Sequence, residues 1–298
     1  MKTCAYPETY WNKYIAMDIT RCAQFRRKFM KEGISEIAKK YKAYNKSMMD
    51  IWEDYNFLEF YLPHLHQGIK KDELPIFEKP HLYNSRRSKY DKNNLYGVID
   101  HLLKSVTPVR ALLESVSTTE HFLQEITFRV YRDYQFKLVN KDESMEQSSK
   151  LLYTIVNSAD KDEIIYKIAE EKIRGIFYGN PLDFFQKDKA QLGFNDYFKL
   201  NHKFALGKYA EIIARRNIYT HNQGKVDRKY IREVKDPKFS LRQIAVIDEE
   251  YIRETIIILR GLATVATKLI IENTYNATNS NQTIKRKFET FEKMYKNK

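Results

Sequence analysis

The sequence predicts an all-α protein built from long helices. Residues that break helices are scarce, since the 298 residues include only 9 glycines and 7 prolines, whereas sandwiches and barrels need many tight turns. Apolar residues also recur at helical intervals, as at Leu112, Val116, Leu123 and Val130. Hydrophobic residues make up 43% and charged residues 31% of the chain, which is typical of a globular protein and not of a disordered one.

Residues 1–94 are predicted to form an N-terminal helical region and a linker. Apolar residues recur at near-helical intervals from Thr20 to Leu62, which predicts one or two helices. The segment from Leu62 to Asn94 holds three of the seven prolines and many charges. Prolines and charges at this density are typical of a linker.

Residues 95–275 are predicted to form a helical bundle. One helix should run to a break at Thr107-Pro108, and a long helix should follow it. A shorter helix is expected over Asp162–Phe177, with isoleucines on its inward face. The last helix of this block should begin near Asp248, because acidic residues favour the positive end of the helix dipole.

The segments around the last two helices of the bundle carry turn and charge signals. Asn180 is expected to cap a helix that has Pro181 at its first position. Gly224 should end the helix over residues 201–222 by adopting a positive φ. A basic loop with a net charge of +4 follows from Lys225 to Arg242. Residues 276–298 are expected to form a basic tail.

Charge, cysteine content and hydropathy narrow the function classes. A net charge of +13 favours polyanions, with nucleic acid first and an anionic membrane surface second; the alternative is that excess lysine keeps the protein soluble. Cys4 and Cys22 form neither a disulfide framework nor a zinc pattern, which indicates a reducing compartment. The N-terminus lacks an apolar signal region, and the apolar run Thr255–Ile271 carries two cations, so we expect a cytoplasmic protein without a membrane span.

The stretch "EIIARRNIYTHNQGKVDRKYI", residues 211–231, carries the candidate chemistry. His221 can move a proton near neutral pH, and Arg216 can bind a phosphate through its guanidinium fork. Asn217 can hold a hydroxyl or orient the imidazole. Together they suit metal-independent RNA cleavage, in which the 2′-hydroxyl attacks the neighbouring phosphodiester. No metal or cofactor is expected, because the histidine is single and the nearby cations repel a metal ion.

The spacing of these residues leaves other interpretations open. The cations could simply interact with the helix dipole and the free carbonyls at a helix end. On an ideal helix, Arg216 and His221 point about 140° apart. To meet on one ligand they need a loosened helix end, a swing of the long arginine side chain, or a second copy of the chain.

The stretch "RNIYTH", Arg216 to His221, matches the Arg-polar-x-x-x-His signature of the HEPN superfamily, and "HNQGKVD" resembles the turn that follows it in ribonuclease-like members. "GNPLDFFQKDKAQLGFNDYFKL" resembles the segment before the motif helix, and "SVSTTEHFLQEI" resembles part of the first long helix. The resemblance covers residues 95–274. One departure is Gln223, which stands where members paired with small nucleotidyltransferases have a tyrosine, so silencing by modification there is not expected.

The resemblance implies an up-down helical bundle and a homodimer with a shared basic cleft. It implies that Arg216 and His221 are the catalytic pair, with Asn217 as the polar second position. Glu120 would be a supporting acid, and Glu125 is the alternative. Members often act in antiviral defence or as toxins with a partner antitoxin.

Residues beside the motif are candidates for RNA contacts. They are Arg215, Asn222, Lys225, Arg228 and Lys229. The alternatives are a solvated basic face and, for Asn222, capping of the helix. The sequence therefore predicts a metal-independent endoribonuclease that leaves 2′,3′-cyclic phosphate ends. A non-catalytic RNA- or nucleotide-binding module acting through a partner, and a helical scaffold, remain as alternatives.

Overall fold

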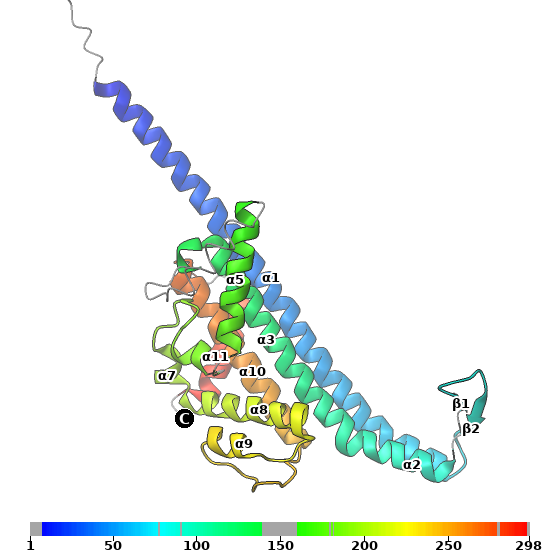
Figure 1. Ribbon diagram of the computed structural model, residues 1–298. Helices are drawn as coiled ribbons and strands as arrows, with labels where there is room; N and C mark the ends of the chain where they lie inside the picture. Colours follow the sequence, from blue (N-terminus) through cyan, green and yellow to red (C-terminus); the bar gives the residue numbers. More distant parts are fainter. Residues whose placement is uncertain are drawn as a thin grey trace, which may run out of the picture.

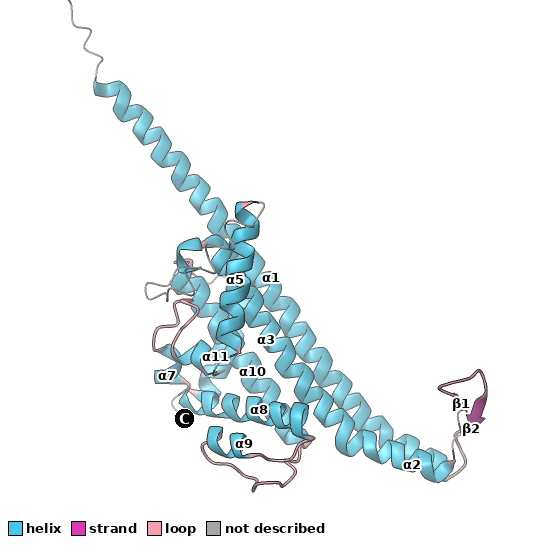
Figure 2. Ribbon diagram, in the orientation of Figure 1, coloured by secondary structure: helices cyan, strands magenta, loops and turns pink. Residues whose placement is uncertain are grey.

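The structure is a computed structural model. It describes residues 8–76, 78–89, 91–138, 160–178, 180, 182–278 and 281–296, with backbone alone for residues 8–27, 29 and 161. This part of the chain is predominantly helical and forms an all-α helical bundle, as expected (Figure 2). Cys4 and the side chain of Cys22 lie outside it.

The helices are α1 (Glu8–Lys70), α2 (Lys92–His101), α3 (Thr107–Asp133), α5 (Lys161–Phe177), α6 (Asp183–Gln186), α7 (Tyr197–Asn201), α8 (Lys203–Asn222), α9 (Arg228–Glu233), α10 (Glu249–Leu269) and α11 (Gln282–Tyr295). Short π-helical segments span Leu102–Val106 and Ile270–Thr274, and a 3-10 turn spans Gln135–Leu138. Two exposed strands, β1 (Glu78–Pro80) and β2 (Arg87–Lys89), pair antiparallel with Glu78 opposite Lys89.

The long helices α1 and α3 lie side by side and run in opposite directions, with α5, α8, α10 and α11 packed beside them (Figure 1). One hydrophobic core joins all six helices. Hydroxyl pairs cross it as well: Tyr41 of α1 bonds Thr264 of α10 at 2.7 Å, and Tyr44 bonds Thr119 of α3 at 3.0 Å. The core therefore runs across the boundary expected at residue 94, because α1 supplies one wall of the same bundle.

The expected linker from Leu62 to Asn94 begins inside a helix. Helix α1 continues through Pro63 to Lys70, although proline removes a backbone hydrogen bond. Its last turns bury Leu62 and Ile69 against Leu95 and Ile99 of α2, and this packing offsets the lost bond.

The expected break at Thr107-Pro108 is a π-helical segment instead. Helix α2 continues through Leu102–Val106 directly into α3. Pro108 cannot donate to a preceding carbonyl, and the wider turn accommodates this without interrupting the helix. Both Thr107 and Pro108 are buried, so core packing holds the continuous helix in place.

The segment after α5 differs in detail from the expected cap. The Asn180 side chain accepts a hydrogen bond from the Leu182 amide at 3.0 Å, and α6 begins only at Asp183. Asn180 therefore organises the turn before the helix rather than its first residue. Pro181 lies outside the described residues.

The expected basic tail, residues 276–298, is largely a packed helix. In α11 the residues Ile284, Phe291 and Tyr295 are buried in the core. Gly261 of α10 makes room for Phe291, since a Cβ atom on this glycine would lie against the Phe291 ring. Lys285, Arg286 and Lys293 are exposed on the other faces of this amphipathic helix.

Lys287 joins α11 to α1 by donating to Asn45 at 2.6 Å. Burial, with Arg260 and Arg286 nearby, lowers the pKa of Lys287 to about 8. The unfolded chain then binds more protons than the folded one between pH 8 and the ordinary pKa of 10.5, so stability should rise with pH in this window. At pH 7, Lys287→Met should raise the free energy of unfolding by about 1 kcal/mol, allowing for the partial exposure of the site.

Urea unfolding at pH 7 and pH 9.5 tests this prediction, with the exposed Lys293→Met as the matched control. The gain from Lys287→Met should shrink at the higher pH, and Lys293→Met should show no such change. A difference from wild type that is the same at both pH values would contradict the account.

Across the part of the chain that the structure describes, we find no helix with both the length and the apolar character needed to cross a membrane.

Candidate functional site

Helix α8 presents one continuous face to a cleft of about 850 Å³. The residues of this face follow one another at helical spacing: Ala210, Ile213, Ala214, Asn217 and His221. The other walls come from α3, from α9 and from the end of α5 with the turn after it. They contribute Glu120, Gln124, Phe177, Tyr178, Asn180, Leu182, Lys229, Arg232 and Glu233.

Arg216 and His221 line the same cleft within one chain. Helix α8 stays regular to Asn222, so a loosened helix end does not bring them together. His221 belongs to the face that lines the cleft, while Arg216 lies at its edge, three residues after Ile213, and has the longer side chain. The five-residue spacing therefore does not by itself require a second copy of the chain.

Glu120 of α3 is the acidic residue beside the motif. Its carboxylate forms an ion pair with the Arg216 guanidinium, and both side chains are mostly buried. Burial raises the pKa of Glu120, and the positive charge of Arg216 opposes this shift. Glu125, the alternative, instead pairs with Lys40 of α1 at 2.8 Å and is not among the residues that line the cleft.

The ion pair with Glu120 does not satisfy every hydrogen-bond donor of the Arg216 guanidinium. Its buried Nε atom has no hydrogen-bond partner among the described residues. A phosphate in the cleft would compete with Glu120 for the charge of the Arg216 guanidinium. Because a protonated Glu120 no longer competes, its raised pKa favours release of Arg216 as the pH falls.

Arg215 is not available to RNA, which corrects the expectation for this residue. Its side chain is only 4% exposed and its guanidinium bonds Glu211 at 2.6 Å and the Val246 carbonyl at 2.8 Å. It also stacks over the Tyr251 ring, 3.8 Å from its centroid. Arg215 therefore links the segment after α9 to α8, and its charge is neutralised by Glu211 inside the protein.

The segment Lys225–Arg242, expected as a basic loop, contains regular secondary structure. It contains α9, and Lys225 forms an isolated antiparallel bridge with Ile244. A small core holds it against α8, made of Ala214, Ile218, Val226, Tyr230, Val234 and Ala245. This packing fixes the position of α9 beside the motif.

The other four candidates for RNA contacts are placed differently from one another. Lys229 lines the cleft, whereas Lys225 and Arg228 are exposed but do not line it. The Asn222 amide donates to the Lys225 carbonyl at 2.6 Å and so closes the turn after α8. Only Lys229 is thus brought next to the catalytic candidates, and its role in RNA binding stays a prediction.

Gly224 ends α8 with φ +77°, as expected, and the preceding Gln223 is also left-handed. A Cβ atom on Gly224 would lie 2.6 Å from the Tyr219 ring, whose hydroxyl is held by the Ala245 carbonyl at 2.7 Å. We therefore expect Gly224→Ala to destabilise the protein by about 1–3 kcal/mol in thermal or urea unfolding.

Gly207→Ala is the matched control, because it lies in the same helix and a Cβ atom there meets nothing within 4 Å. It should leave stability unchanged or raise it by about 0.5–1 kcal/mol. Equal losses for both variants would contradict the account of the turn.

Five polar or charged residues of the cleft are not among the sequence candidates: Gln124, Tyr178, Asn180, Arg232 and Glu233. Gln124 could have been found, since it lies one helical turn after Glu120. Arg232 follows Lys229 by three residues in α9 and shares its face. No sequence signal places Tyr178 or Asn180 beside the motif, because the contact between the end of α5 and α8 is tertiary.

The residues described contain no group of three His, Cys, Asp or Glu side chains that could hold a metal ion. The polar groups that line the cleft are three cations, two carboxylates, three amides, one imidazole and the Tyr178 hydroxyl. Comparison of the chain with protein-family models, curated proteins and solved structures found no match in any of the three.

Proposed function

We propose that the protein is a metal-independent endoribonuclease of HEPN type. The observation that carries this proposal is that Arg216, Asn217 and His221 line one cleft together with Glu120 and Lys229. A cleft with a permanent cation and an imidazole suits a phosphodiester whose charge grows during the reaction. The net charge of +13 is compatible with RNA as the partner.

In the proposed reaction His221 takes the proton from a 2′-hydroxyl. The 2′-oxygen attacks the adjacent phosphorus, the bond to the 5′-oxygen breaks, and the leaving 5′-oxygen takes up a proton from water. Arg216 stabilises the negative charge on the phosphate in the transition state. The products are a 2′,3′-cyclic phosphate and a 5′-hydroxyl end, and no metal takes part.

The reaction class is tested with wild-type protein and RNA in EDTA. Cleaved products should carry 2′,3′-cyclic phosphate ends, detected by mass spectrometry. A single 2′-deoxy substitution at a mapped cleavage site should abolish cleavage there and leave other sites unaffected, since it removes the nucleophile. Cleavage that persists at the deoxy position would overturn the proposed mechanism.

The alternative is a non-catalytic RNA- or nucleotide-binding module that acts through a partner. The ion pair between Glu120 and Arg216 favours this alternative, because it occupies the cation that catalysis needs. Retained RNA binding without cleavage, in Glu120→Gln as well as in wild type, would select it. Cleavage that appears only in Glu120→Gln would instead indicate an enzyme held inactive by this pair.

The proposal includes a homodimer and a cytoplasmic location. A role in antiviral defence, or as a toxin with an antitoxin, follows from the resemblance alone.

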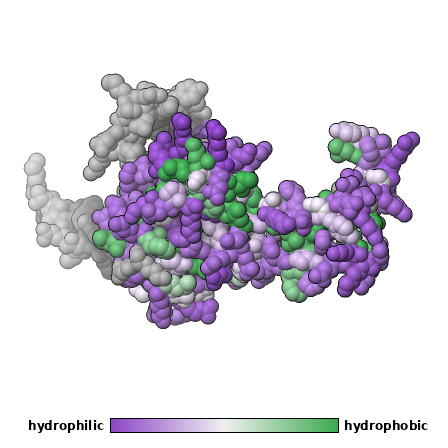
Figure 3. Space-filling view, turned by 90° about the horizontal axis from the view of Figure 1, so that it is seen from below, coloured by the Kyte–Doolittle hydropathy of each residue, from purple (hydrophilic) through white to green (hydrophobic). Residues whose placement is uncertain are grey.

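Seen from below, hydrophobic side chains gather on part of a mostly hydrophilic surface (Figure 3). The segment after α9 exposes Leu241, Ile244 and Val246. Such residues suit contact with a second copy, and sedimentation equilibrium of wild type and Val246→Asp tests this. A monomeric wild type would exclude the dimer.

A further inference from the structure

The aromatic ring of Tyr178 is exposed to solvent at the rim of the cleft. It follows the last residue of α5 and is 85% exposed. Other tyrosines of the body, such as Tyr131, Tyr209 and Tyr230, are at most 2% exposed. Its ring stacks on no other ring among the described residues, and it helps to line the cleft that holds Arg216 and His221.

The walls of the cleft carry different kinds of side chain. Lys229 and Arg232, one turn apart on α9, add two cations to Arg216 of α8. Two carboxylates line the same cleft: Glu120 pairs with Arg216, and Glu233 lies 3.9 Å from Arg232, so a phosphate competes with them for these two cations. The end of α5 and the turn after it instead supply the rings of Phe177 and Tyr178. Its volume of about 850 Å³ lies within the range of roughly 300–1,000 Å³ that is common for small-molecule sites.

This division matches the two ends of a nucleotide. Phosphates are held by cations, while the face of a base stacks on an aromatic ring. Bases in a duplex are already stacked on their neighbours, and the major groove of an RNA helix is too narrow for side chains. A ring at the rim can therefore stack on an unpaired base but not on a base inside a continuous duplex.

We propose that the cleft binds an unpaired nucleotide of single-stranded RNA, with the base stacked on Tyr178 and the phosphates held by Arg216, Lys229 and Arg232. The inference rests on the proposed function in taking RNA as the ligand, but it concerns binding and needs no cleavage. Stacking tolerates any base, so the site selects strandedness and not a fixed sequence.

The test measures the affinity of a fluorescent 2′-O-methyl RNA strand of mixed sequence, which lacks the nucleophile, by anisotropy. The same strand annealed to its complement serves as the duplex. Tyr178→Ala should raise the Kd for the single strand by about tenfold, whereas Tyr178→Phe keeps the ring and should bind almost as wild type does. Tyr83→Ala is the matched control, because Tyr83 is 86% exposed but lies between β1 and β2, away from the cleft.

The inference fails if Tyr178→Ala binds the single strand as wild type does, if Tyr83→Ala loses as much affinity, if the duplex binds as tightly, or if wild type binds no RNA. Its failure is distinguishable from that of the proposed function. Cleavage by wild type with no dependence of binding on Tyr178 overturns the inference alone. Binding that depends on Tyr178 without any cleavage overturns the proposed reaction alone.

Discussion

Replacing His221 by alanine is expected to lower kcat/KM for RNA cleavage by about 10²- to 10⁴-fold, the range that one general acid or base contributes. His221 is exposed at the end of α8 and lines the cleft. Within the described residues its side chain is not part of the hydrophobic core. The loss should therefore be one of proton transfer, with the melting temperature close to that of wild type.

Two further variants sharpen this prediction. His101→Ala removes another exposed histidine, on α2, and should leave kcat/KM unchanged. His221→Gln keeps a polar side chain without a group that titrates near neutral pH, and should lose as much activity as His221→Ala. If His221→Gln retained wild-type activity, the side chain would act by positioning the RNA and not by transferring a proton.

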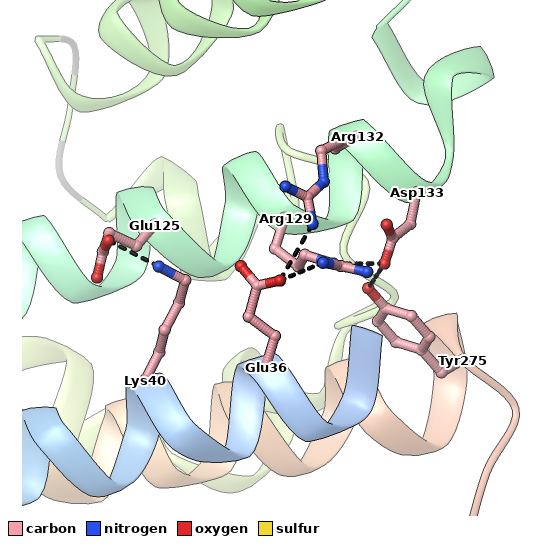
Figure 4. Close-up of polar contacts among 7 residues, drawn as sticks. All are labelled: Glu36, Lys40, Glu125, Arg129, Arg132, Asp133 and Tyr275. Atoms are coloured by element: carbon pink, nitrogen blue, oxygen red, sulfur yellow. Dashed lines mark hydrogen bonds and ion pairs between the residues drawn. The ribbon is translucent and has the colours of Figure 1, made fainter. Parts of the chain in front are cut away.

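Replacing Arg129 by methionine is expected to lower the free energy of unfolding by about 3–5 kcal/mol, because it leaves a buried carboxylate unpaired. The Arg129 side chain is 5% exposed, and its Nε atom donates to Asp133 at 2.8 Å. Tyr275 donates to the same carboxylate at 2.6 Å, and Arg129 also pairs with Glu36 of α1 (Figure 4). The cluster thus joins α1, α3 and the segment after α10.

The close packing of this cluster depends on Gly33 of α1. A Cβ atom there would lie 2.4 Å from the Asp133 carboxylate and 2.6 Å from the Tyr275 ring. Burial and the Asp133 charge both raise the pKa of Tyr275, so its hydroxyl stays a hydrogen-bond donor at neutral pH.

Matched variants separate the buried pair from a simple loss of charge. Arg132→Met removes a half-exposed arginine that pairs with Glu36 at 3.1 Å, and should cost less than about 1 kcal/mol. Arg129→Met combined with Asp133→Asn should recover part of the loss, because no buried charge is then left unpaired. Urea unfolding measures all four proteins, and equal effects of Arg129→Met and Arg132→Met would contradict the account.

The sequence predicts the helices well where a local pattern defines them. The spacing of Leu112, Val116, Leu123 and Val130 marks the buried face of α3, and all four are buried. Gly224 takes the positive φ that its position after α8 suggests. The all-α fold is therefore confirmed, because helical periodicity is a property of neighbouring residues.

The sequence predicts less well which helices pack together. The many cations of residues 276–298 predict a basic tail, but the spacing of Ile284, Phe288 and Phe291 marks the side of α11 that packs against the core. The sequence also predicts a separate region for residues 1–94, yet α1 supplies one wall of the core. No local signal reports such contacts, since they join residues far apart in the chain.

The candidate site shows the same limit on a smaller scale. Arg215 and Arg216 are adjacent, so both suit phosphate binding by residue type. Their side chains leave α8 about 100° apart, and that turn sends Arg215 into the contacts with Glu211 and Tyr251 while Arg216 reaches the cleft. Only the partners that pack around α8 distinguish a structural arginine from a candidate for catalysis.

The central claim is that Arg216 and His221 of this cleft cleave RNA without a metal ion. The most direct test incubates a mixed RNA pool in EDTA with wild type and with the variant that carries both Arg216→Ala and His221→Ala. The account predicts cleavage by wild type and none by the double variant. Equal cleavage by both proteins, or cleavage by wild type only after a divalent metal is added, would contradict it.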